Sequence, residues 1–210
     1  YSPDGKKIIF LARNENGNLP KIYIYNKENY KITEIDTDSL YVTELEFNKN
    51  NNEIIFIAAT VIKNSSLNSK PSFSYDIYKI TNGSVEKITE LKAKSITGLA
   101  VSKRGSVFTN IETFDRKYYG LYNISQKNLR NNGPTQIRAQ FNEGTELGYN
   151  FLFNPTIAEN DSVLIVTSSR IMVKVDLSNS KASTVLVAGE AFIYSPRFFH
   201  NSDKIIFTKD

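Results

Sequence analysis

The 210-residue sequence has no cysteine, no tryptophan, one methionine and one histidine. Without cysteine the chain can form neither a disulfide scaffold nor a thiolate metal site. The single histidine, His200, excludes a metal centre built from several histidines and would have to serve any Ser-His-Asp triad by itself. No Gly-x-Ser-x-Gly elbow and no glycine-rich phosphate loop occurs either. We therefore expect no catalytic residues, no metal and no cofactor.

Charge of neither sign is concentrated in any part of the chain. The 26 basic and 22 acidic residues give a net charge of +4, and they alternate along the sequence, with basic clusters no longer than pairs such as Lys6-Lys7. Nucleic-acid binding requires a basic face or stripe, so no nucleic-acid partner is expected. No apolar run approaches the roughly 18 residues of a membrane span. The chain begins with Tyr rather than Met, so we expect the natural N-terminus to lie upstream.

One sequence unit recurs along the chain. It consists of an aromatic or apolar residue, a polar turn and a strand-like Ile-Ile-Phe or its equivalent. The copies are Tyr1–Phe10, Phe47–Phe56, Val101–Phe108, Phe153–Ile165 with an insertion at Thr156–Glu159, and Phe199–Phe207. Recurrence at intervals of about 40–60 residues is typical of propeller blades.

Further strand-like segments lie between these copies. They alternate apolar with polar residues and are rich in β-branched and aromatic side chains, a pattern typical of strands. They are Lys21–Tyr25, Asp76–Ile80, Gly120–Ile124 and Ile171–Leu177, followed respectively by Tyr30–Ile35, Val85–Thr89, Thr135–Arg138 and Ala182–Val187. Each full unit thus holds four short strands, and no window shows sustained helical periodicity. The sequence predicts an all-β protein, a β-propeller of four-stranded antiparallel blades. A single β-sandwich is the alternative, but it would not require the recurring unit.

The predicted repeat units are 1–40, 41–94, 95–147, 148–190 and a partial unit, 191–210. They form one propeller domain or a segment of one, with about 17 strands in four to five blades. The first and last units both contribute a second strand, and the two would compete for one place in a closed four-bladed ring. The chain is therefore expected to be part of a larger ring.

The segment Tyr1–Phe10, with its Ser-Pro-Asp-Gly turn, followed by Ile22–Ile24, resembles the TolB-type, WD40-like propeller repeat. Asp76–Tyr78 matches the third strand of that repeat, and Ser195-Pro196, ahead of Asp203–Phe207, is a degenerate echo of its turn. The resembling group includes partner-binding proteins of the bacterial cell envelope and the non-catalytic propellers of prolyl-oligopeptidase-like peptidases. The resemblance implies a six-bladed TolB-like ring and an extracytoplasmic location, in the periplasm or at the cell surface.

The Ser-Pro-Asp-Gly motif has a structural explanation. Proline presets φ, aspartate accepts backbone N–H groups and glycine tolerates positive φ. We therefore assign Asp4 and Gly5 to turn formation and not to a site.

Binding residues are expected on the long loops. In a propeller, the second-to-third and fourth-to-first connections share one face, and the longest irregular segments fall there: Ala12–Pro20, Thr60–Ser74, Glu112–Tyr118 and Ala139–Gly148. Long loops on a rigid scaffold commonly carry binding residues. The candidate contacts to a ligand or partner are Lys63, Lys70, Phe73, Arg116 and Arg138.

Other polar residues are expected to have no site role. His200 falls in a turn on the opposite face and is expected to be a solvent-exposed turn residue. Asp36-Thr37-Asp38 begins like a calcium loop but lacks its glycine and final glutamate. Glu112 and Asp115 adjoin Arg116 and Lys117, which favours a surface ion cluster.

The leading functional prediction is a non-catalytic interaction module of the cell envelope. It would bind a protein, a peptide or a glycan through its long-loop face or central channel. The alternative is the accessory propeller of a larger, prolyl-oligopeptidase-like hydrolase whose catalytic domain lies outside this chain. A propeller lyase or glycosidase is disfavoured by the lone histidine. The sequence beyond Asp210 would separate the first two hypotheses.

Overall fold

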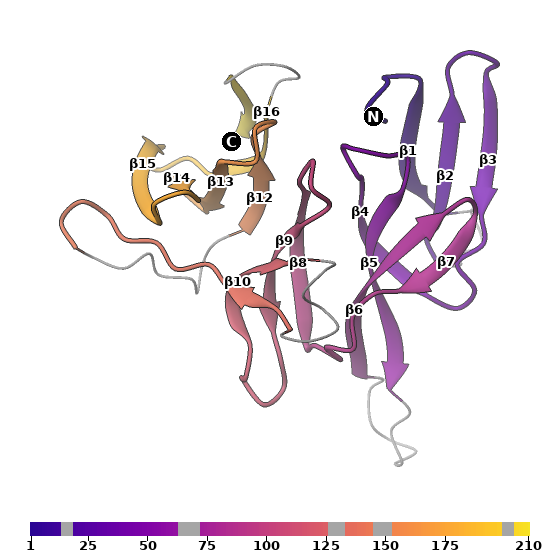
Figure 1. Ribbon diagram of the computed structural model, residues 1–210, viewed down its shortest axis with the longest axis horizontal. Helices are drawn as coiled ribbons and strands as arrows, with labels where there is room; N and C mark the ends of the chain where they lie inside the picture. Colours follow the sequence, from indigo (N-terminus) through magenta and orange to yellow (C-terminus); the bar gives the residue numbers. More distant parts are fainter. Residues whose placement is uncertain (14–18, 63–71, 126–132, 145–152, 199–203) are drawn as a thin grey trace. The chain divides into compact units, whose positions relative to one another are not determined.

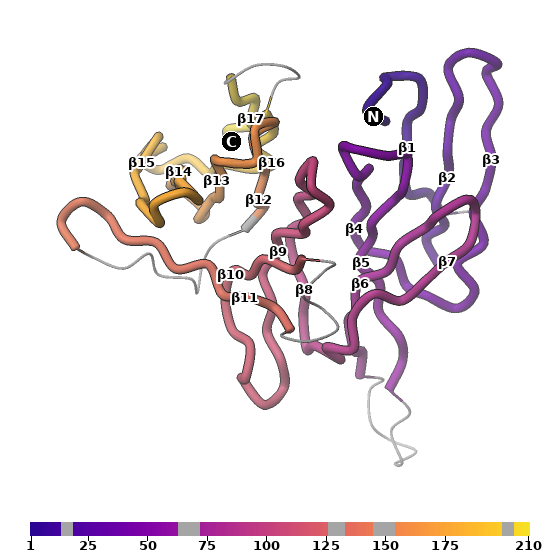
Figure 2. The backbone as a smooth tube through the Cα atoms, in the orientation of Figure 1, coloured from indigo at the N-terminus to yellow at the C-terminus, as the bar shows by residue number. Residues whose placement is uncertain are grey.

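The computed structural model describes residues 1–13, 19–62, 72–125, 133–144, 153–198 and 204–210. These residues form 17 β-strands arranged in five antiparallel sheets (Figures 1 and 2). The predicted all-β class and four-stranded blades are confirmed. Within the described residues, no helix has the length and hydropathy needed to cross a membrane. Contacts divide the chain into two compact units, one comprising Tyr1–Ile96 with Thr113–Asp115, the other Thr97–Glu112 with Arg116–Asp210.

Unit 1 holds two sheets in which spatial order follows chain order (Figure 1). The three strands of the first sheet are β1 (Lys7–Ala12), β2 (Lys21–Asn26) and β3 (Lys31–Ile35). The four strands of the second sheet are β4 (Tyr41–Phe47), β5 (Ile54–Ile62), β6 (Ser72–Thr81) and β7 (Ser84–Lys87).

Unit 2 holds the other three sheets, the first of which begins at the boundary between the units. That sheet contains β8 (Ser95–Val101), β9 (Val107–Glu112), β10 (Tyr119–Ile124) and β11 (Thr135–Gln136). The next contains β12 (Phe153–Ile157), β13 (Val163–Ser168), β14 (Ile171–Asp176) and β15 (Lys181–Val187). The last contains β16 (Ile193–Phe198) and β17 (Ile205–Lys209).

Apolar side chains from neighbouring sheets form the core within each unit. In unit 1, Ile22 of the first sheet packs with Val42 and Phe56 of the second, and the Phe56 ring stacks on Tyr78 with centroids 5.3 Å apart. In unit 2, one cluster joins Phe108 to Leu164, and a second joins Ile165 to Ile193 across the last two sheets. All four residues of β7, the last strand of its sheet, are exposed. Neighbouring sheets of the same unit thus pack apolar side chains against each other, as the blades of a propeller do.

The turn before β1 shows why the repeat begins with Ser-Pro-Asp-Gly. The Ser2 N–H donates to the Lys7 carbonyl at 2.9 Å, and the Gly5 N–H donates to the Ser2 carbonyl at 2.9 Å. Asp4 accepts the Ser2 hydroxyl at 2.6 Å and the Lys6 N–H at 3.0 Å, and these hydrogen bonds lower the pKa of Asp4. Gly5 has φ +69°, which the absence of a Cβ permits. The turn roles of Asp4 and Gly5 are confirmed.

The same turn reveals a wrong alignment in the fourth unit. Here the Ala158 N–H donates to the Val163 carbonyl at 2.8 Å, matching the Ser2 to Lys7 bond. The predicted insertion at Thr156–Glu159 therefore does not exist: Thr156 ends the bulged part of β12, and the turn starts at Ala158. The Phe-Asn-Pro sequence resembles a turn, but it forms a β-bulge in which Asn154 has φ +47°.

Ser195-Pro196 is a second bulge rather than an echo of the turn. It lies inside β16, where the register with β17 shifts between Tyr194 and Arg197, and Ser195 has φ +48°. Proline cannot donate to a strand ladder, so a bulge is one of the few places in a sheet that accept it.

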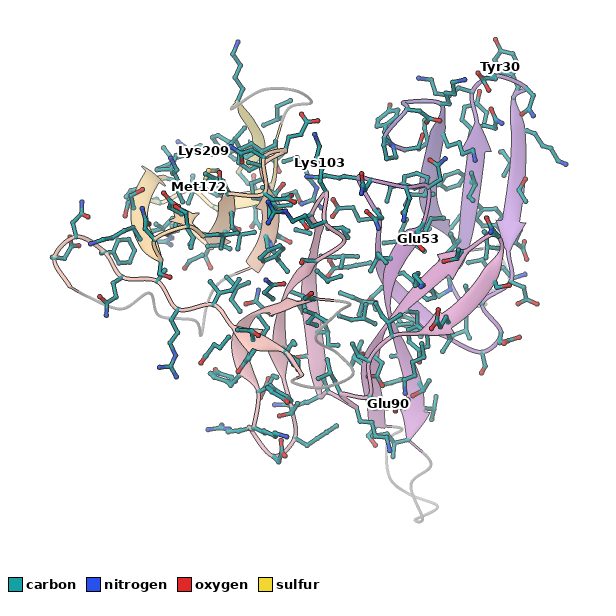
Figure 3. The ribbon with its side chains drawn as sticks, viewed as in Figure 1. Tyr30, Glu53, Glu90, Lys103, Met172 and Lys209 are labelled. Atoms are coloured by element: carbon teal, nitrogen blue, oxygen red, sulfur yellow. The ribbon has the colours of Figure 1, made fainter. Side chains whose placement is uncertain are left out.

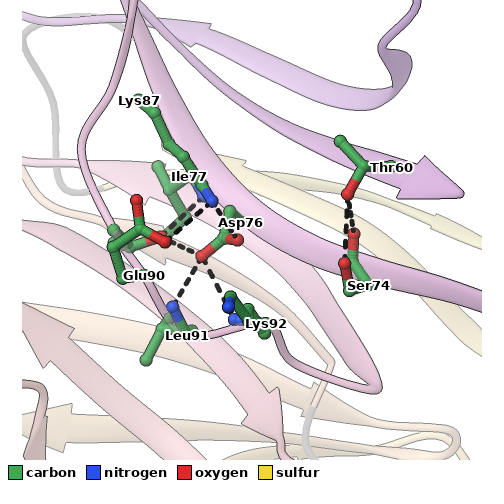
Figure 4. Close-up of polar contacts among 9 residues, drawn as sticks. Thr60, Ser74, Asp76, Ile77, Lys87, Glu90, Leu91 and Lys92 are labelled. Carbon is green, nitrogen blue, oxygen red and sulfur yellow. Dashed lines mark hydrogen bonds and ion pairs between the residues drawn. The ribbon is translucent and has the colours of Figure 1, made fainter. Parts of the chain in front are cut away.

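The predicted irregular segment Thr60–Ser74 is also partly wrong. Strand β5 extends to Ile62, and β6 begins at Ser72, with Val61 paired to Phe73. The Thr60 and Ser74 hydroxyls are hydrogen-bonded at 3.0 Å (Figure 4). The β-branched run Thr-Val-Ile favours continued strand pairing over a loop. Residue 73 is therefore held by a sheet.

Candidate functional site

A surface pocket of about 330 Å³ lies in unit 1 where β1 ends and β4 begins. This is the side that carries the second-to-third strand connection of the first sheet and the connection into the next sheet. The volume lies at the lower end of the range for small-ligand sites. The pocket is lined by Leu11, Ala12, Arg13, Pro20, Tyr41, Val42 and Thr43.

Arg13 and Tyr41 are the polar groups that define the pocket. The Arg13 guanidinium donates a hydrogen bond to the Tyr41 hydroxyl and lies 5.4 Å from the centroid of the Tyr41 ring. Tyr41 is the first residue of β4, and its neighbour Val42 is only 1% exposed. The sheet therefore fixes the aromatic ring, and the ring in turn positions the arginine.

An exposed apolar surface adjoins the pocket. The Phe73 ring lies 6.4 Å from the Tyr41 ring, centroid to centroid. The pairings Tyr41–Ala59 and Val61–Phe73 put Tyr41, Val61 and Phe73 on one face of the sheet, because alternate residues of a strand share a face. Phe73 is 38% exposed and Val61 60% exposed. The end of the β5–β6 hairpin thus presents apolar side chains beside a cation.

Asp76 is a prominent buried charge, and its contacts explain it as a structural residue. Its Oδ1 accepts hydrogen bonds from the Thr89 hydroxyl at 2.9 Å, the Leu91 N–H at 2.6 Å and the Lys92 N–H at 3.3 Å. Its Oδ2 lies 3.0 Å from the Lys87 ammonium (Figure 4). These contacts fasten the segment that follows β7 to β6, and the chain itself satisfies both carboxylate oxygens.

Lys87 and Glu53 also form ion pairs within this sheet. Burial alone would lower the pKa of Lys87, but its bonds to Asp76 and Glu90 outweigh burial and raise it. For Glu53, labelled in Figure 3, burial would raise the pKa, whereas hydrogen bonds from Asn51, Thr81 and Asn48 lower it. Both charged groups are held by the chain's own partners, so neither indicates a ligand site.

The structure places three of the five predicted contact residues. Phe73 lies beside the pocket. Arg116 lies in the β9–β10 connection with φ +57°, and Arg138 follows β11; both are exposed and belong to unit 2. Lys63 and Lys70 lie outside the described residues, as does His200. The binding roles of these residues remain predictions. Sequence reasoning missed Arg13 and Tyr41, although Arg13 lies within the long segment Ala12–Pro20.

No protein-family model and no curated protein matches the sequence. Solved structures do match the whole chain. TolB from Acinetobacter baumannii matches with a TM-score of 0.64 at 15% identity, and a TolB structure from Agrobacterium tumefaciens with 0.69 at 14%. Hydrazine synthase from Kuenenia stuttgartiensis matches with a TM-score of 0.71 at 11% identity. The chain has a TolB-like β-propeller fold.

At these identities the likeness establishes the TolB-like fold alone. The TolB-like chain spans 50% of the Acinetobacter protein, 68% of the Agrobacterium protein and 35% of the hydrazine synthase chain. The number of blades in a complete ring, which the resemblance to the TolB-type repeat implies to be six, remains a prediction.

Proposed function

We propose that this TolB-like chain is a non-catalytic interaction module that binds a peptide segment of a partner protein at the Arg13–Tyr41 pocket. One observation carries the proposal: a cationic, partly aromatic pocket on the connection side continues into exposed apolar side chains on the paired strands β5 and β6. Exposed apolar groups beside a polar anchor are typical of protein interaction sites.

The composition of the pocket favours a peptide over a glycan. Leu11, Pro20 and Val42 provide apolar walls, and the polar side chains are Arg13, Tyr41 and Thr43, of which only the two hydroxyls can accept a hydrogen bond. A sugar presents many hydroxyl groups that need both donors and acceptors. A peptide can instead place one polar group on Arg13 and an apolar side chain against Tyr41 and Phe73.

A location in the bacterial cell envelope, in the periplasm or at the cell surface, belongs to the same proposal. The likeness to TolB structures supports it. If the full gene product carries a hydrolase domain beyond Asp210, the accessory-propeller hypothesis replaces the free-standing module.

The test is selection of a random linear peptide library on the intact chain, followed by affinity measurements of the enriched peptides on two variants. Phe73→Ala removes an apolar side chain beside the pocket. Tyr30→Ala is the matched control, because Tyr30 is 78% exposed at the β2–β3 turn (Figure 3). We expect Phe73→Ala to weaken binding by about tenfold, as loss of an interface aromatic commonly does, and Tyr30→Ala to leave it unchanged. Equal binding to both variants, or no enriched peptide, would refute the proposal.

A further inference from the structure

We infer that the pocket recognises a carboxylate. This rests on the proposed function and names its ligand class: a peptide that places a carboxylate on the Arg13 guanidinium and an adjacent apolar side chain against Tyr41 and Phe73.

The hydrogen-bonding capacity of Arg13 is the first argument. A guanidinium has five N–H donors in a planar fork. Among the described residues, the Tyr41 hydroxyl is the one acceptor recorded for Arg13. The remaining donors suit a carboxylate, whose two oxygens match the fork and form short, charge-assisted hydrogen bonds.

The charge around the pocket is the second argument. None of its seven lining residues is acidic. The ion pairs recorded among the described residues involve Lys6, Lys21, Lys79, Lys87 and Lys103. No acidic side chain therefore lines the pocket beside the Arg13 guanidinium, and an anionic ligand would bring a negative charge to it.

Tyr41 adds a second polar contact. Its oxygen accepts from Arg13, so its own O–H remains able to donate. A carboxylate held by the guanidinium could accept a hydrogen bond from the Tyr41 O–H with its second oxygen. Tyr41 would then both position Arg13 and contact the ligand, while its ring and Phe73 pack against the neighbouring apolar side chain.

Unit 2 offers a matched control for this inference. There the Arg170 guanidinium lies 5.3 Å from the Phe192 ring centroid, almost the same spacing as in the pocket. Phe192 has no hydroxyl to hold the guanidinium. The backbones of Phe192 and Asp210 are paired by two hydrogen bonds of 3.1 Å. Arg170 thus reproduces the contact between a guanidinium and an aromatic ring, but it lacks the hydroxyl that holds Arg13 in the pocket.

The experiment is an NMR titration of the isotope-labelled intact chain with N-acetylphenylalanine and its uncharged amide. We expect the acid to shift the amide resonances of Tyr41 and Phe73 with an affinity about tenfold above that of the amide, because hydrogen bonds to charged groups contribute this much or more. Arg13→Gln should remove that preference, and Arg170→Gln should keep it. A second arm, N-acetylphenylalanyl-glutamine-amide against its glutamate counterpart, distinguishes a side-chain carboxylate from a chain terminus.

Preference for the charged member of either probe pair, lost in Arg13→Gln, supports the inference and identifies the source of the carboxylate. Equal binding of charged and uncharged probes at Tyr41 and Phe73 overturns the inference but leaves the proposed function standing. An unchanged preference in Arg13→Gln, or its loss in Arg170→Gln, also overturns the inference. The library selection decides separately whether the pocket binds peptides at all.

Discussion

Asp76 and Arg13 are charged side chains of the same unit with opposite surroundings. Asp76 is 2% exposed, and three hydrogen-bond donors and an ammonium from its own chain satisfy its carboxylate. Arg13 is exposed, and one tyrosine hydroxyl is its recorded acceptor among the described residues. A charge satisfied from within contributes to folding, whereas a charge with donors to spare at a pocket can bind a ligand. This difference assigns Asp76 to the stability of unit 1 and Arg13 to its candidate binding site.

The largest expected effect comes from Asp76→Ala. The substitution leaves the Leu91 and Lys92 N–H groups and the Lys87 ammonium without their acceptor. Removal of one partner of a buried ion pair commonly costs about 3–5 kcal/mol of unfolding free energy. Urea denaturation measures this loss. The control is Asp36→Ala, which removes a single exposed turn contact, the Asp38 N–H to Asp36 bond of 2.9 Å. Equal losses for the two variants would show that the Asp76 network does not stabilise the unit.

Arg13→Gln should produce the reverse pattern. We expect the affinity for an acidic peptide to fall by about tenfold, or roughly 1.4 kcal/mol, because the guanidinium donors are lost. The unfolding free energy should change by less than about 0.5 kcal/mol, as for most surface substitutions. Calorimetric titration and urea denaturation of one preparation test both parts. A large loss of stability with unchanged affinity would make Arg13 a structural residue like Asp76.

Alkaline pH should weaken the Asp76 network through its ion pair with Lys87. The pKa of Lys87 is raised above 10.5 in the folded state. Its contribution to stability is therefore fully present below that pH and is lost as pH rises through the folded pKa. Wild type should lose more stability than Lys87→Gln between about pH 9 and pH 12. Thermal melting of both proteins across this range measures how much more stability the wild type loses. Because both proteins contain the same tyrosines, the effect of tyrosine titration cancels when the two curves are subtracted. Parallel curves would contradict the role assigned to Lys87.

Arg170→Gln should have the smallest effect. The side chain is exposed and contacts the Phe192 ring in unit 2, a type of contact worth about 0.5–1 kcal/mol at exposed sites. We expect a loss of stability of at most that size and no change in affinity for acidic peptides. Competition binding and thermal melting test this. Weakened binding in this variant would move the candidate site to unit 2.

The sequence predicts the strands and turns well because they depend on local patterns. The alternation in segments such as Lys21–Tyr25 and the turn chemistry of Asp4 and Gly5 are both present in the structure. The misassigned segments also have local causes. Phe153-Asn154-Pro155 carries turn residues inside a bulged strand, and Thr60–Ile62 continues a strand into what length alone suggested was a loop.

The pocket could not be predicted in the same way. Arg13 and Tyr41 are 28 residues apart, and they meet because the first and second sheets of unit 1 pack together. No local pattern encodes that packing. The sequence offers Phe73 as a candidate because it falls in the long predicted loop Thr60–Ser74. Its position beside Tyr41 instead follows from the register of β5 and β6, whose pairing extends further than the sequence indicated.

The most direct test of the account is the coupling between Arg13 and the charge of the ligand. Four affinities are measured by calorimetry: wild type and Arg13→Gln, each with an acidic peptide from the selection and with the same peptide in uncharged, amidated form. A coupling free energy of about 1.5 kcal/mol or more between the two changes is expected for a charge-assisted hydrogen bond. Additive effects, with a coupling near zero, would show that Arg13 does not contact the carboxylate and would contradict the assignment of its spare donors to a ligand.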